Sequence, residues 1–195
     1  MSKETVVVEA KCERVTIDPS YVARLTMILS AICVVVALLL GIVNTITEPI
    51  ITQMQAEKTA AAMAQVLQAE DYEKIDASFD NVVAIYEAIS GSKQLGYVVE
   101  VTTSGFGGVI NMVVGVDMNG TVTGVSVTKN AETKNIGTKV VGDQSVLDRF
   151  VGMSGNITVN TGANRFDGIT GATVTSKAVT AGVNTALDAV AALKS

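Results

Sequence analysis

Residues 108–128 read "GVINMVVGVDMNGTVTGVSVT", and this stretch predicts a β-hairpin. Its first half, residues 108–117, is rich in β-branched residues, and Val125 and Val127 alternate with polar residues in its second half. Between the halves, Asn119-Gly120 is typical of a tight hairpin turn. The segment "GYVVEV" (96–101) just upstream has the same character and predicts a neighbouring strand. We therefore expect a sheet rich in antiparallel pairs.

Helical patterns flank these strands. "DQSVLDRFVG" predicts a short helix capped by Asp143, and "TSKAVTAGVNTALDAVAALKS" (175–195) predicts a long amphipathic helix at the end of the chain. The apolar positions with helical spacing in the long helix are Val179, Val183, Leu187 and Val190. Strands in the middle with helices at both ends predict a compact α+β domain whose sheet is covered on one face.

An apolar segment near the amino terminus predicts a transmembrane helix over residues 25–45. The sequence "LTMILSAICVVVALLLGIV" begins at Leu25, and the 23 residues between Arg24 and Glu48 carry no charge. A helix of that length is roughly 35 Å long, which exceeds the ~30 Å hydrocarbon thickness of a bilayer. The alternative is a cleaved signal peptide. The long polar region before the segment, and the lack of a small-x-small pattern after Val43, favour an uncleaved anchor.

The distribution of positive charge predicts the orientation of this single span. The first 24 residues contain four basic residues, whereas Lys58 is the first one beyond the span. The four are Lys3, Lys11, Arg14 and Arg24. The positive-inside rule places residues 1–24 in the cytoplasm and the rest of the chain outside, although an equal number of acids in the tail cancels its net charge. The predicted location is the cell (inner) membrane of a bacterium or archaeon.

The region after the span divides into two predicted parts. Residues 46–79 are expected to form a helical stalk, with Pro49 in the first turn of its helix. Residues 80–195 are expected to form the extracytoplasmic domain.

Composition excludes several classes of function. The chain has no histidine, and its two cysteines, Cys12 and Cys33, lie in the tail and in the span. We therefore expect no metal site, no iron–sulfur cluster and no histidine-assisted nucleophile in the outer domain. The formal net charge of −5 argues against nucleic acid as a partner.

The stretch "DGITGATVTSKAV" (167–179) is a glycine- and threonine-rich turn that leads into the last helix. Its simplest interpretation is structural, with Thr173, Thr175 or Ser176 capping the helix. A chemical interpretation is also open. Free N–H groups at a helix start attract phosphate, and the neighbouring hydroxyls could carry a phosphoester.

The residues from Asp167 to Thr173, "DGITGAT", resemble the flavinylation motif Asp-x-x-Ser/Thr-Gly-Ala-Ser/Thr of covalent FMN-binding domains. This resemblance implies that Thr173 carries FMN through its phosphate, and that a dedicated flavin transferase makes the bond with FAD as donor. Its recognition positions correspond to Asp167, Thr170, Gly171 and Ala172.

The three residues at positions 175–177 follow the motif directly and are expected at the cofactor site: Thr175, Ser176 and Lys177. Lys177 either neutralises phosphate charge or is an ordinary surface lysine. Thr173 is expected to be an attachment point, so no catalytic residue is predicted.

The segment "NAETKNIGTKV" (130–140) is similar to a second part of the same family, a loop that lies against the flavin. Glu132, Thr133 and Gly137 match that loop. Asn130, Lys134 and Asn135 depart from it, which affects contacts with the flavin ring rather than the attachment.

One amino-terminal span followed by an outward FMN domain resembles the G subunits of Rnf complexes, which are membrane-bound ferredoxin:NAD oxidoreductases coupled to ion movement. This resemblance implies an electron-transfer subunit without a complete active site of its own, whose partners are the other membrane subunits of the complex. Two alternatives stay open. The chain could be a C-type subunit of a sodium-pumping NADH:quinone reductase, or a membrane-tethered binding or assembly module without flavin.

Overall fold

The computed structural model describes residues 19–194, which fall into two compact units that meet between Ile51 and Thr52. Helix α1 (Pro19–Val66) forms the described part of the first unit and continues into the second. It contains an 18-residue window with a mean hydropathy of 2.9 and no buried residue, so it is long and apolar enough to cross a membrane. Residues 1–18 of the predicted cytoplasmic tail lie outside the described residues.

Helix α1 runs through Pro49, which was expected to begin a separate helix. A proline removes one intrahelical hydrogen bond, here to the carbonyl of Thr45, and the residues on both sides continue the helix across it. The region 46–79 is also not helical throughout. The helix ends at Val66, and strand β1 (Asp71–Ile75) follows within the range expected to be stalk.

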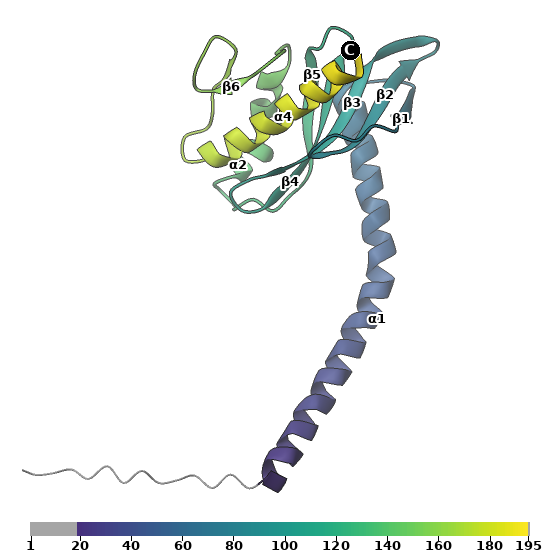
Figure 1. Cartoon of the computed structure of the whole chain (residues 1–195), viewed down its shortest axis with the longest axis vertical. Coiled ribbons are helices and arrows are strands. Elements are labelled where there is room, and N and C mark those ends of the chain that lie inside the picture. The colour runs from purple at the N-terminus through teal and green to yellow at the C-terminus, as the bar shows by residue number, and fades with distance from the viewer. Residues whose placement is uncertain (1–18, 195) are drawn as a thin grey trace, which may run out of the picture. The chain divides into compact units, whose positions relative to one another are not determined.

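The second unit is built on a five-stranded sheet in the order β1-β2-β3-β4-β5, with every neighbouring pair antiparallel (Figure 1). The four strands after β1 are β2 (Val82–Ser90), β3 (Lys93–Ser104), β4 (Val109–Asp117) and β5 (Val122–Asn130). The predicted strands correspond to β3, β4 and β5. The α+β class and the antiparallel sheet are confirmed.

Shorter elements connect β5 to the last helix. They are α2 (Thr138–Val141), α3 (Gln144–Leu147), the 3-10 helix η1 (Asp148–Phe150), and a parallel pair of two-residue strands, β6 (Thr158–Val159) and β7 (Arg165–Phe166). Asp143 caps α3 by accepting a hydrogen bond from the Ser145 N–H at 3.0 Å, as predicted. Helix α4 (Thr173–Lys194) ends the described chain and contains the predicted amphipathic pattern.

The β4–β5 hairpin forms with a tight turn at Asn119 and Gly120, as predicted, and the loop includes Met118 as well. The Asp117 carbonyl accepts from the Gly120 N–H at 3.1 Å, the Asp117 N–H donates to Thr121, and Gly120 has φ +79°. These features describe a three-residue loop over 118–120. The Asp117 carboxylate selects this geometry because it accepts from the N–H groups of Asn119 and Thr121, both at 2.8 Å.

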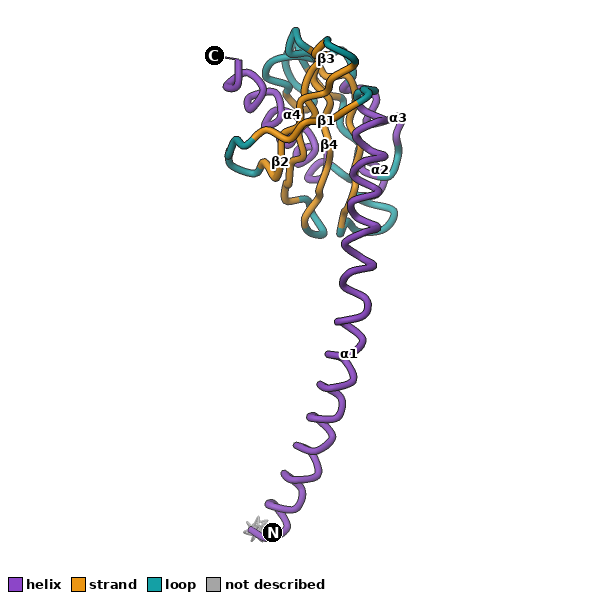
Figure 2. The backbone as a smooth tube through the Cα atoms, turned by 90° about the vertical axis from the view of Figure 1, so that its right-hand side faces the viewer, coloured by secondary structure: helices purple, strands orange, loops and turns teal. Residues whose placement is uncertain are grey.

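Helix α4 covers one face of the sheet (Figure 2). Its apolar stripe is buried in one cluster with side chains from β3 and β4. The helix contributes Val179, Val183, Ala186 and Val190, and the strands contribute Val99, Val101, Met112 and Val114. Gly182 permits the close approach, because a Cβ there would lie only 3.0 Å from the Met112 sulfur.

The opposite face is partly covered as well, which corrects the expectation of a sheet covered on one side. The last turns of α1, at Ala62, Met63 and Val66, are buried in a cluster with residues of β2, β3 and β4. Gly115 and Gly124 pair across β4 and β5, and a Cβ on either would lie within 2.8 Å of Val66 backbone atoms. These two glycines therefore form the flat surface on which the helix end rests.

We expect Gly124→Ala to destabilise the domain by about 1–3 kcal/mol, because the added methyl group must displace the Val66 backbone. Thermal unfolding of the full-length chain in detergent measures this loss. Gly91→Asn is the matched control: Gly91 has φ +60° in open space, and the chain already has asparagine at φ 63° at Asn81. Equal effects of the two substitutions would contradict a specific contact with Val66.

Candidate functional site

The start of α4 is formed by a tight turn. The Ala172 N–H donates to the Ile169 carbonyl at 2.9 Å, and Gly171, the third residue of this turn, has φ +81°. The Ser176 N–H then donates to the Ala172 carbonyl at 2.9 Å, which makes Ala172 the N-cap residue. An alanine side chain cannot accept a hydrogen bond. Among residues 19–194, no side-chain oxygen accepts from the N–H groups of positions 173–175.

None of the three hydroxyls expected to cap this helix accepts a hydrogen bond from its first N–H groups. The buried Ser176 Oγ accepts from the Ile169 N–H at 3.1 Å and so fastens the turn to the first turn of the helix. Thr173 is exposed, and Thr175 is buried without a hydrogen-bond partner for its hydroxyl. The prediction of a side-chain cap is therefore wrong, because the N-cap position falls on Ala172.

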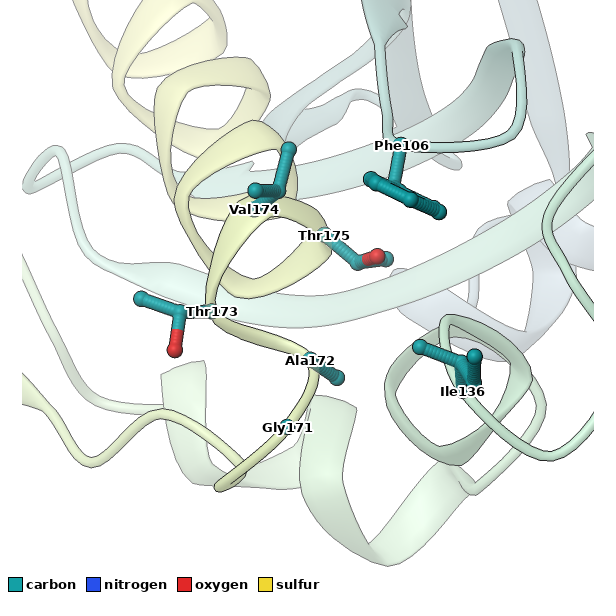
Figure 3. A pocket seen from close by; sticks show the side chains of 7 residues that line it. All are labelled: Phe106, Ile136, Gly171, Ala172, Thr173, Val174 and Thr175. Atoms are coloured by element: carbon teal, nitrogen blue, oxygen red, sulfur yellow. The ribbon is translucent and has the colours of Figure 1, made fainter.

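A cavity of about 310 Å³ opens beside this helix start (Figure 3). It is lined by Phe106, Ile136, Gly171, Ala172, Thr173, Val174 and Thr175. Phe106 and Ile136 come from two loops and face the helix start, and the Thr175 side chain points toward the space between them. Thr173 lies at the rim, with its side chain on the other side of the helix start. The lining is mostly apolar and carries no charge.

Glu132 joins the two loops that supply Phe106 and Ile136. Its Oε1 accepts from the Phe106 N–H at 2.8 Å, and its Oε2 accepts from the Gly107 N–H at 3.3 Å. A Cβ on Gly105 or on Gly137 would lie within about 2 Å of the same carboxylate, so a side chain at either position would displace it. Glu132 thus fixes the position of Phe106 and does not itself line the cavity.

The structure gathers some of the predicted site residues and separates others. Gly171, Ala172, Thr173 and Thr175 line the cavity. The remaining predicted residues do not line it: Asp167, Thr170, Ser176, Lys177, Thr133, Glu132 and Gly137.

Two further residues outside the cavity make contacts that the structure defines, and Lys177 is exposed. The Asp167 carboxylate pairs with Arg165 at 3.1 Å. The Thr133 carbonyl accepts from the Ile136 N–H at 3.1 Å and thereby shapes the loop. Lys177 is exposed four residues after Thr173, on the same side of α4.

Three lining residues were missed by sequence reasoning: Phe106, Ile136 and Val174. Phe106 lies in the segment "GFGGV" (105–109), for which no functional role was predicted. The signal in the sequence was a phenylalanine between glycines, in a chain with only four phenylalanines. In the structure this side chain is 62% exposed.

The arrangement fits a ligand that combines a phosphate with a flat, largely apolar ring. The unpaired N–H groups at the start of α4 suit a phosphate, and the Thr173 hydroxyl lies beside them. The apolar cavity suits ring faces, and the orphaned Thr175 hydroxyl is buried in its wall. FMN has these features, and its ribityl chain separates the phosphate from the ring.

Comparison with known proteins gives matches over most of the chain. Residues 105–188 match the family described as FMN-binding domain. The chain is 32% identical to the G subunit of the Na(+)-translocating ferredoxin:NAD(+) oxidoreductase complex of Acetobacterium woodii, over 88% of this chain and 93% of that protein. It is 28% identical to the G subunit of the proton-translocating ferredoxin:NAD(+) oxidoreductase complex of Clostridium ljungdahlii, over 89% and 94%.

Among solved structures, the C subunit of the Na(+)-translocating NADH-quinone reductase from Parabacteroides distasonis is similar, with a TM-score of 0.48 and 22% identity. That match covers 57% of this chain and 63% of the other.

We expect Glu132→Ala to speed hydrogen exchange at the Phe106 and Gly107 amides, because their acceptor is removed. Gly137→Ala should disturb the same loop by pushing on the carboxylate, and its effect should shrink in the Glu132→Ala background. Exchange measured by mass spectrometry on the four proteins of this cycle tests the coupling. Lys134→Ala, in the same loop and exposed, serves as the control. Additive effects of the two substitutions would contradict a contact between the Glu132 carboxylate and both loops.

Proposed function

Because the chain belongs to the family of G subunits of ion-translocating ferredoxin:NAD(+) oxidoreductase complexes, we propose that it is the electron-transfer subunit of such a complex and carries FMN covalently on Thr173. The partners in this proposal are the other membrane subunits, together with a flavin transferase that acts during maturation. The two relatives named above move different ions, so the ion moved by this complex is left open.

One observation carries the covalent part of the proposal. Thr173 is the first residue of α4, its side chain is exposed, and the N–H groups beside it lack a side-chain cap. A phosphate held on the Thr173 oxygen would lie at the positive end of the helix dipole. Lys177, one turn further on the same side, supplies a positive charge that would complement the phosphate.

Attachment needs an external catalyst. The Thr173 hydroxyl loses its proton and its oxygen forms a bond to the FMN phosphorus of FAD, while the bond to AMP breaks and AMP leaves. Threonine by itself is a weak nucleophile, and no residue that lines the cavity is a base. The activating groups therefore belong to the transferase.

Bound FMN would supply the capacity to accept and release electrons. The chain's own contribution is to hold the ring between Phe106 and Ile136 and to keep it in an apolar, uncharged environment. Reaction with ferredoxin and NAD, and the movement of ions, are assigned to the partner subunits.

A covalent bond also suits the proposed topology. With the basic tail in the cytoplasm, the span within α1 carries the FMN domain to the outer side. A cofactor lost there could not be replaced from the cytoplasmic pool, and a phosphoester prevents the loss in every oxidation state.

The test is the intact mass of the full-length chain produced with and without a flavin transferase. The wild type should gain the mass of FMN less water, and Thr173→Ala should gain nothing. Thr173→Ser should keep at least part of the modification, because it keeps a hydroxyl. Thr185→Ala, on the same helix but away from the cavity, is the matched control and should be modified like the wild type.

An unmodified wild type, with the transferase shown active on another substrate, would overturn the proposal. The chain would then be a membrane-tethered binding or assembly module in which the threonine turn is only structural.

A further inference from the structure

The Thr175 hydroxyl has no hydrogen-bond partner, although it is fully buried. Its side chain is 0% exposed, and within residues 19–194 its Oγ1 is the only buried side-chain nitrogen or oxygen that lacks a partner. Buried polar groups are nearly always paired, because leaving one unpaired costs free energy. The exception therefore calls for an explanation.

Other hydroxyls on α4 are paired by a simple local rule. Thr180 donates to the Ser176 carbonyl at 2.9 Å, and Thr185 donates to the Ala181 carbonyl at 3.0 Å, each four residues earlier. For Thr175 the corresponding residue is Gly171. It precedes the helix in the turn with φ +81°, and its carbonyl does not accept from the Thr175 hydroxyl. The position of Thr175 at the helix start thus removes its usual acceptor.

The surroundings of this hydroxyl point to a ligand. Thr175 lines the cavity at the start of α4, and its side chain points toward the space between Phe106 and Ile136 (Figure 3). Phe106, Ile136, Ala172 and Val174 present only apolar side-chain atoms there. A flavin ring has apolar faces and an edge of carbonyl oxygens and ring nitrogens. A single buried donor is what such an edge needs in an otherwise apolar cavity.

We propose, building on the proposed function, that Thr175 is a positioning residue that donates its hydroxyl proton in a hydrogen bond to an acceptor on the polar edge of the flavin ring. In this proposal Thr173 holds the phosphate, and Thr175 orients the ring and adjusts its midpoint potential. Reduction increases the electron density on the carbonyl oxygens of that edge, so a hydrogen bond donated to one of them stabilises the reduced form more than the oxidised form. The hydroxyl therefore raises the potential.

The test compares Thr175→Val, which keeps the shape but removes the hydroxyl, with Thr175→Ser, which keeps the hydroxyl. Each is made in the full-length chain, both with the flavin attached and in the Thr173→Ala background, which cannot carry it. Without flavin, Thr175→Val should raise the melting temperature, by roughly 2–4 °C, because it removes an unpaired buried group. With flavin it should lower the melting temperature and make the midpoint potential more negative. Thr175→Ser should stay close to the wild-type potential.

Thr180→Val is the matched control, since Thr180 is also buried on α4 but has a partner within the helix. It should lower the melting temperature equally with and without flavin and leave the potential unchanged. Shifts of the same sign for Thr175→Val in both forms, with an unchanged potential, would overturn the inference while the flavin mass on the wild type still upheld the proposed function. Absence of that mass would overturn both.

Discussion

The packing of α4 against β3 and β4 fixes where that helix begins, and the candidate site depends on this. The apolar stripe at Val179, Val183 and Val190 is buried among valines and Met112 of the sheet, and Gly182 lets the helix approach closely. A hydrogen bond from the Thr103 hydroxyl to the Ala178 carbonyl at 3.2 Å adds a polar tie near the end of β3. The core holds the helix, and the Ser176 hydroxyl fastens the preceding turn to it, so the first turn of α4 lies beside the loop after β3.

Among residues 19–194, the one buried side-chain oxygen or nitrogen without a partner lies in that first turn. Side chains complete the local hydrogen bonding at two other places, as Asp117 does in the hairpin and Asp143 does at α3. At the start of α4 the N-cap is an alanine, and Thr175 is buried without a partner. Local rules are often broken where a ligand supplies the missing partners. The loop that carries Phe106 is different, because its backbone is paired. The Glu132 carboxylate accepts from the Phe106 N–H and holds the loop in place.

Helix α1 is one continuous element with two different parts, a candidate membrane span and an end that packs on the sheet. Its amino-terminal part is apolar on all sides, as a membrane requires, whereas its last turns bury only Ala62, Met63 and Val66 against the sheet. The paired glycines of β4 and β5 accept the Val66 backbone, and the Thr123 hydroxyl donates to its carbonyl at 2.7 Å. The second face of the sheet is therefore stabilised by the same helix that carries the candidate span.

The sequence by itself determined the features that local chemistry encodes: the apolar span, strands β3 to β5, the Asp143 cap, helix α4, and the motif from Asp167 to Thr173. It failed where a choice depended on the hydrogen bonds that a turn makes or on distant residues. The length of the hairpin loop was set by the Asp117 side chain, and the helix cap fell on Ala172 because of the preceding turn. Phe106 and Ile136, 30 residues apart, face α4 only because Glu132 joins their loops, and the state of the Thr175 hydroxyl is visible only once its surroundings are folded. Periodicity and motifs act over a few neighbouring residues, whereas burial and hydrogen-bond satisfaction are properties of the whole packed chain, so tertiary structure alone could decide them.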